Sequence, residues 1–67
     1  MNFTIETEQE VDGRWIAEVV ELPGVMTYGS SRTQAIAKAE ALALREMAER
    51  IENGEQLAAP ISISFAA

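Results

Sequence analysis

The segment from Trp15 to Gly29, WIAEVVELPGVMTYG, constrains the fold most, because a long alanine-rich helix pattern follows it directly. Residues 14–22 are rich in Trp, Ile and Val and predict a strand. Pro23-Gly24 ends that strand, since proline has no amide proton for a ladder and glycine permits a tight reversal. Residues 25–28 then predict a short edge strand. Strands that run into one long helix are typical of a small α+β domain.

The first residues predict the other half of a hairpin. Residues 2–10 alternate apolar and polar side chains, which indicates a half-buried strand, and Asp12-Gly13 is a turn signal. Two registers are open. A two-residue turn places the apolar side chains of the first strand on the face of Ile16, Val20 and Leu22. A three-residue turn with a bulge places them on the face of Trp15, Ala17 and Val19. Either register leaves at least three apolar side chains on the other face, so we expect that face to be covered.

The helix is predicted from about Arg32 to Asn53. Ser31 and Gln34 have the spacing of a capping box, in which each side chain bonds a backbone amide of the other residue. Gly54 is well placed to end the helix in a left-handed conformation. Pro60 then precedes a last strand, expected at residues 61–65, with its Ile and Phe side chains inward.

Apolar residues occupy more than one side of this helix. At 3.6 residues per turn, the core stripe is expected to contain Ala35, Ile36, Ala39, Leu42, Ala43 and Met47. A second group extends the apolar surface around the helix and comprises Ala37, Ala41, Leu44, Ala48 and Ile51. Exposed alanine is common because alanine is a good helix former. Leu44 and Ile51 are the reason to predict a contact between copies of the chain on this side.

Length and composition indicate one domain over residues 1–67 that gains from self-association. A chain of 67 residues buries only about 60% of its unfolded surface, so its core is marginal. It has no Cys and no His, which removes disulfides and His/Cys metal sites as stabilisers. We expect a homodimer or larger. The lack of Cys fits a reducing compartment. No apolar run approaches the ~20 residues of a membrane span, and no signal segment is evident. A cytoplasmic protein is therefore expected.

The charge is acidic and concentrated near the N-terminus. The net charge is −6, and the first 24 residues carry −5 of it. Such a field repels phosphate backbones and attracts basic partners, so we expect a protein partner and no direct nucleic-acid binding. Solubility is the competing explanation of this surface. The residues expected to contact a partner are Glu8, Glu10, Asp12, Arg14, Trp15, Glu18, Met26 and Tyr28. Trp15 is open to two interpretations, because a Trp on a strand serves either as core or as an interface anchor.

The residue types in the sequence do not favour an enzyme. Without His or Cys the chain has no imidazole base, no thiolate nucleophile and no His/Cys zinc site. Ser30, Ser31 and Thr33 have no activating neighbour and are better explained as helix caps. We therefore expect no enzyme, no cofactor and no metal.

Two short motifs, Glu-Leu-Pro-Gly at residues 21–24 and Thr-Gln-Ala at 33–35, lie in a strand, strand, helix order that resembles the HicB-like antitoxins. The resemblance covers Phe3 to Phe65. It implies a partial ribonuclease-H-like fold with the order β-β-β-α-β, in which three antiparallel strands are joined by a final strand beside the first and one helix packs on one face. It also implies that the chain binds a small HicA-like ribonuclease toxin and occludes its active site.

Two features depart from what the resemblance implies. Nucleases of the ribonuclease-H fold hold two divalent metals with carboxylates from the first strand, the helix and the last strand, yet residues 61–65 contain no acid. Larger HicB proteins append a helix-turn-helix or ribbon-helix-helix domain, and no separate DNA-binding domain is expected here. The alternative function is an orphan homo-oligomeric structural or small-ligand-binding protein without a toxin.

Overall fold

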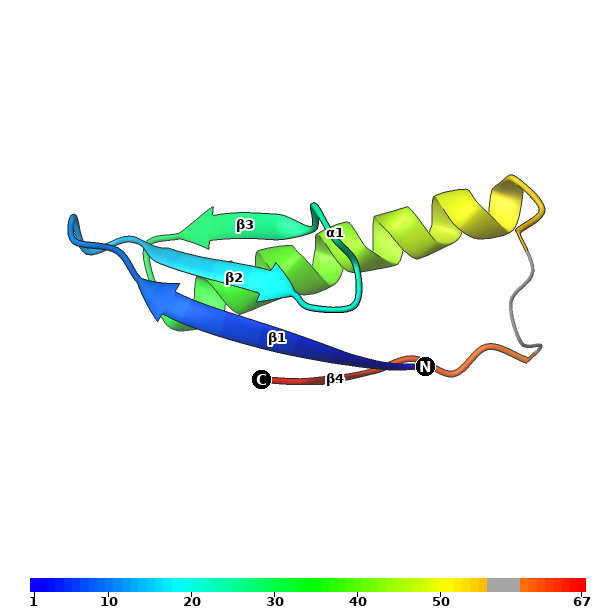
Figure 1. Cartoon of the computed structure of the whole chain (residues 1–67), viewed down its shortest axis with the longest axis horizontal. Coiled ribbons are helices and arrows are strands. Elements are labelled where there is room, and N and C mark those ends of the chain that lie inside the picture. The colour runs from blue at the N-terminus through cyan, green and yellow to red at the C-terminus, as the bar shows by residue number, and fades with distance from the viewer. Residues whose placement is uncertain (56–59) are drawn as a thin grey trace.

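The computed structural model describes residues 1–55 and 60–67, and within them it contains four strands and one helix. The elements follow the order β1 (Asn2–Gln9), β2 (Trp15–Val19), β3 (Met26–Gly29), α1 (Arg32–Glu52) and β4 (Ser64–Ala66). They form a single sheet in the order β3-β2-β1-β4, in which β4 runs parallel to β1 and the other pairs are antiparallel. The helix covers one face of the sheet and extends past the ends of β2 and β3 (Figure 1). The predicted α+β class and the β-β-β-α-β order are confirmed.

The hairpin between β1 and β2 has the three-residue turn. Ile5 pairs with Val19 and Gln9 with Trp15, and the chain reverses through residues 11–13. The Gly13 amide donates to the Glu10 carbonyl at 2.9 Å, and Gly13 adopts a φ of +92°. Only glycine takes this conformation without cost, which is why a Gly ends the turn.

This register puts the apolar side chains of the first strand on the same side as Ala17 and Val19, under the helix. The buried core joins residues from the sheet, the β2–β3 connection and α1: Phe3, Ile5, Ala17, Val19, Leu22, Val25, Ala35, Ala39, Ala43 and Met47. Ile36 and Leu42 are half-buried against it. The expected core stripe of the helix is therefore confirmed, and its three alanines allow the helix to lie close to the sheet.

Both ends of α1 are capped by local hydrogen bonds. Ser31 has an extended backbone, and its Oγ accepts a bond from the Gln34 amide at 3.0 Å, as predicted. The return bond differs from a capping box, because Gln34 Oε1 accepts from the Ser30 amide at 2.6 Å and from the Ser30 hydroxyl at 3.0 Å. At the other end the Glu55 amide donates to the Arg50 carbonyl, and the Gly54 amide donates to the Ile51 carbonyl. Gly54 adopts a φ of +76°. This is a Schellman motif.

The last strand is shorter than predicted. β4 begins at Ser64, which pairs with Asn2, whereas Ile61 lies outside the strand and is 39% exposed. The reason is that β1 begins at Asn2, so residues 61–63 have almost no strand to pair with. Phe65 still packs inward, with its ring centroid 5.6 Å from that of Phe3.

The connection after β2 also departs from the expected strand. β2 ends at Val19, and two backbone hydrogen bonds close the turn after it. The Leu22 amide donates to the Val19 carbonyl, and the Val25 amide donates to the Leu22 carbonyl. This compact turn folds Leu22 into the core, where it is 3% exposed. As a result, Leu22 does not share the face of Ile16 that strict strand alternation would have given it.

Candidate protein-binding surface

The sheet face turned away from α1 carries a mixed acidic and apolar surface. Side chains alternate along each strand, so the neighbours of the buried core residues point to this side. We call it the open face, and its residues are Thr4, Glu6, Glu8, Ile16, Glu18, Val20, Met26 and Tyr28. All are exposed except Ile16, which is half-buried.

Three glutamates lie close together on the open face. Glu6 sits directly opposite Glu18 across the β1–β2 ladder, and Glu8 sits opposite Ile16. Like charges directly opposite in a sheet are destabilising. Among the described residues the ion pairs are Arg14 with Asp12 and Arg50 with Glu46, so none of these three carboxylates is neutralised. The chain therefore keeps an unfavourable negative cluster at the centre of an exposed face.

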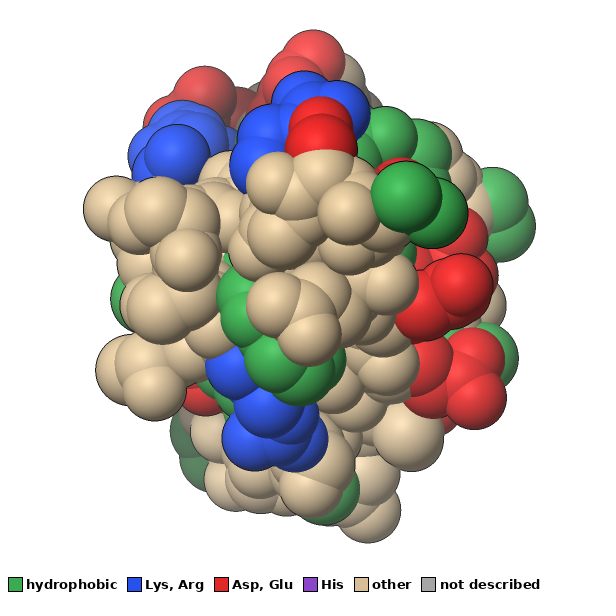
Figure 2. All heavy atoms as spheres, turned by 90° about the vertical axis from the view of Figure 1, so that its left-hand side faces the viewer, with side chains coloured by type: hydrophobic (Ala, Val, Ile, Leu, Met, Phe, Trp, Pro, Cys, Tyr) green, Lys and Arg blue, Asp and Glu red, His purple; other side chains and the backbone are tan. Residues whose placement is uncertain are grey.

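Apolar side chains border these carboxylates. Glu18 pairs with Met26, which is 45% exposed, and Ile16 pairs with Tyr28, which is 41% exposed. A shallow hollow on this face is lined by Glu6, Glu8, Ile16, Glu18 and Met26, together with Thr7. Figure 2 shows a group of acidic side chains along the right-hand side of the molecule with hydrophobic side chains among them. Carboxylates beside apolar groups suit the aliphatic stems and charged heads of Lys and Arg.

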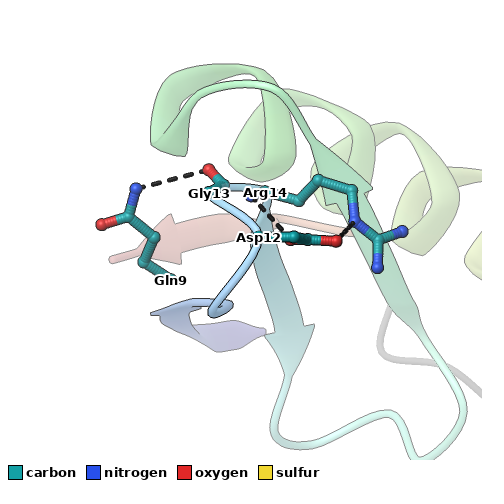
Figure 3. Close-up of polar contacts among 4 residues, drawn as sticks. All are labelled: Gln9, Asp12, Gly13 and Arg14. Carbon is teal, nitrogen blue, oxygen red and sulfur yellow. Dashed lines mark hydrogen bonds and ion pairs between the residues drawn. The ribbon is translucent and has the colours of Figure 1, made fainter.

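The hairpin turn fixes one basic side chain at the rim of this face. Asp12 Oδ1 accepts from the Arg14 amide at 3.1 Å, and Asp12 Oδ2 accepts from Arg14 Nε at 2.8 Å (Figure 3). The backbone bond from Arg14 is the main cause that lowers the pKa of Asp12, with smaller help from the guanidinium. The guanidinium carbon also lies 4.7 Å from the centre of the Tyr28 ring, within the range of a cation–π contact. Arg14 is thus held between Asp12 and Tyr28.

A further side chain supports the same turn. Gln9 Nε2 donates to the Gly13 carbonyl at 3.3 Å (Figure 3). Glu10, Asp12 and Arg14 lie together at this end of the molecule, around a second shallow hollow. They form the acidic tip of the hairpin next to the open face.

Trp15 lies on the opposite side from the open face. It pairs with Gln9 and Gly29, and its half-buried side chain packs against the core under the helix. Of its two sequence-based interpretations, the structure favours core. The other residues expected to contact a partner are brought together, with Glu8, Glu18, Met26 and Tyr28 on the open face and Glu10, Asp12 and Arg14 at its turn end.

The sequence prediction missed four residues of this surface: Thr4, Glu6, Ile16 and Val20. Thr4 and Glu6 have the same strand alternation as Glu8, and that pattern was sufficient to include them. Ile16 and Val20 depended on the hairpin register, which the sequence left open, so no local signal assigned them to this face.

The residues expected to join copies of the chain are all on the surface. Ala37, Ala41, Leu44, Ala48 and Ile51 are exposed on the side of α1 away from the sheet. They are therefore separate from the open face, which the sheet presents on the other side of the molecule.

No metal-binding group of three or more acidic side chains occurs in residues 1–55 and 60–67. The helix found in this part of the chain is not apolar enough to cross a membrane. Comparison with protein-family models, with curated proteins and with solved structures found no match to this chain.

Proposed function

We propose that this chain is an antitoxin that binds a small basic ribonuclease of the HicA type and occludes its active site through the open face. The observation that carries the proposal is the uncompensated cluster of Glu6, Glu8 and Glu18 among exposed apolar side chains. The order of elements and the motifs at residues 21–24 and 33–35 support the choice of family.

The cluster has the properties expected of a surface that meets cations. Glu6 and Glu18 repel one another across the ladder in the free chain. A partner that inserts Lys or Arg between them removes this repulsion and gains charge-assisted hydrogen bonds. Met26 and Ile16 supply apolar contact beside the charges, which an interface needs because exposed ion pairs alone contribute little.

Occlusion follows from the chemistry of the toxin's substrate. A ribonuclease holds the RNA backbone with Lys and Arg side chains that neutralise phosphates. Carboxylates that pair with the same side chains compete with RNA for them. Binding by the open face therefore inhibits cleavage without any chemical step in this protein.

The test first asks whether a neighbouring reading frame encodes a short basic protein, and then uses that protein as the partner. We expect the wild-type chain to bind it and to inhibit its RNA cleavage at a one-to-one ratio. Replacing Glu6, Glu8 and Glu18 together with Gln should slow association and flatten its salt dependence, because long-range attraction acts mainly on the on-rate and is screened over about 8–10 Å. Stopped-flow or surface-based kinetics at two salt concentrations measure both effects.

A matched control removes the same charge elsewhere. Glu49 and Glu52 are exposed in the last turn of α1, and Glu55 is exposed three residues after it. Replacing all three with Gln changes the net charge equally. We expect this control to keep most of the association rate. Equal effects of the two triple variants would mean that the open face is not the binding surface. A neighbouring protein that neither binds nor is inhibited would contradict the antitoxin function itself.

A further inference from the structure

The outward side of α1 has an apolar surface that the folded chain leaves uncovered. Its residues are Ala37, Ala41, Leu44, Ala48 and Ile51, and we call them the outer helix face. The core side of the helix is buried through Ala35, Ala39, Ala43 and Met47. Leu44 and Ile51 are instead 48% and 46% exposed. Exposure of two large aliphatic side chains on one side of a helix is unfavourable in water, and burying them in a contact lowers the free energy.

The spacing of the outer helix face is that of a coiled-coil seam. Successive members are four, three, four and three residues apart, so they occupy alternating a and d positions of a heptad. Ala37, Leu44 and Ile51 then stand at d positions, and Ala41 and Ala48 occupy the a positions. Small a residues let two helices approach closely, with the larger d side chains filling the seam.

The charges beside the seam select a second copy in parallel orientation. In this heptad Glu40 takes a g position and Arg45 an e position, and a parallel pair brings each g residue next to the e residue five positions later in its partner. Glu40 therefore meets the partner subunit's Arg45, twice by symmetry. In an antiparallel pair the e positions face one another, which joins Lys38 to the partner subunit's Glu52 but places Arg45 against Arg45. Only the parallel pair is free of a repulsive contact. Neither Glu40 nor Arg45 takes part in an ion pair among the described residues.

We propose that two copies of this chain associate through the outer helix face as a short parallel coiled coil, with Glu40 of each copy paired to Arg45 of the other. A two-fold axis along the helices generates both pairs. The sheets lie on the far sides of the two helices, so both open faces stay accessible. The dimer therefore presents two acidic surfaces, and this proposal does not depend on what binds them.

Charge reversal at the two flanking positions tests the arrangement. Glu40→Arg and Arg45→Glu should each weaken self-association roughly tenfold, because each turns two attractive contacts into repulsive ones. An equimolar mixture of the two variants should associate as heterodimers with wild-type affinity, since both cross-contacts then join opposite charges. Sedimentation equilibrium over a concentration series, with a fluorescent label on one variant, measures all three affinities.

Two further variants complete the test. Leu44→Glu should abolish association, and Glu49→Arg, at a position outside the seam, should leave it unchanged. Circular dichroism on each variant verifies that the helix is intact. A wild-type chain that stays monomeric at hundreds of micromolar would overturn the proposal. An association that Leu44→Glu leaves intact would overturn the seam, and one insensitive to Glu40→Arg would overturn the parallel orientation.

Discussion

Gly29 shows how one residue allows the helix to begin where it does. A Cβ at this position would lie 2.5 Å from the Ala35 amide nitrogen and 2.9 Å from the Ala35 Cα. Both are backbone atoms of the first turns of α1, which cannot swing aside as a flexible side chain does. The end of β3 and the start of the helix therefore fit together only because residue 29 has no side chain.

We expect Gly29→Ala to destabilise the fold by about 1–3 kcal/mol, the usual cost of forcing extra atoms into a packed site. Urea unfolding followed by circular dichroism measures the free energy of unfolding. Thr33→Ala is the control, because Thr33 is exposed nearby in the first turn and a surface change of this kind is worth within about ±0.5 kcal/mol. Equal stability of Gly29→Ala and wild type would mean that the helix start relaxes freely.

At the scale of elements, a carboxylate ties the β2–β3 connection to β1. Glu21 Oε1 accepts a hydrogen bond from the Thr4 amide at 2.7 Å, while the Thr4 carbonyl accepts one from the Val20 amide at 2.9 Å. The side chain thus takes the place of a ladder carbonyl at the point where β2 has ended. The bond from the Thr4 amide is the main cause that lowers the pKa of Glu21.

This arrangement predicts a pH-dependent contribution to stability. Because the folded pKa of Glu21 lies below the unfolded value, its contribution is complete above the ordinary glutamate pKa of about 4.3 and is lost as the pH falls through the folded pKa. We expect Glu21→Gln to be less stable than wild type near neutral pH, with the difference shrinking in acid. Urea midpoints between pH 7 and pH 3 measure it. A difference that stays constant with pH would show that the charge of Glu21 is irrelevant to the bond.

At the scale of the whole molecule, the position of the helix separates the carboxylates. Glu6 and Glu8 project from the open face, whereas Glu40 belongs to α1 on the other side of the sheet, and β4 (Ser64–Ala66) contains no acid. A two-metal nuclease needs such groups at a single point. We therefore expect no RNA or DNA cleavage with Mg²⁺ or Mn²⁺. Incubation with labelled substrates tests this, and reproducible cleavage that disappears in Glu40→Gln would contradict it.

The sequence by itself determined the element order, the helix and its two ends. The Ser31 cap, the closing Gly54 and the buried alanine stripe were all readable, because helix signals are local and lie within a few residues of the bonds they form. The predicted return bond of Gln34 was wrong, because its side chain accepts from the Ser30 amide and hydroxyl and not from the Ser31 amide. Which neighbouring amide the Gln34 side chain bonds depends on the path of the chain between the end of β3 and the start of α1.

Only the tertiary structure decided which side of the hairpin meets the helix. Side chains alternate with a period of two, so a change of one residue in the turn exchanges the two faces, and Asp12-Gly13 is compatible with both turns. The three-residue turn sends Trp15 under α1 and leaves Glu6 and Ile16 on the open face. The length of β4 was equally non-local, because it depends on where β1 begins. The acidic composition was visible in the chain, but the surface it forms exists only because long-range pairing set β1 against β2.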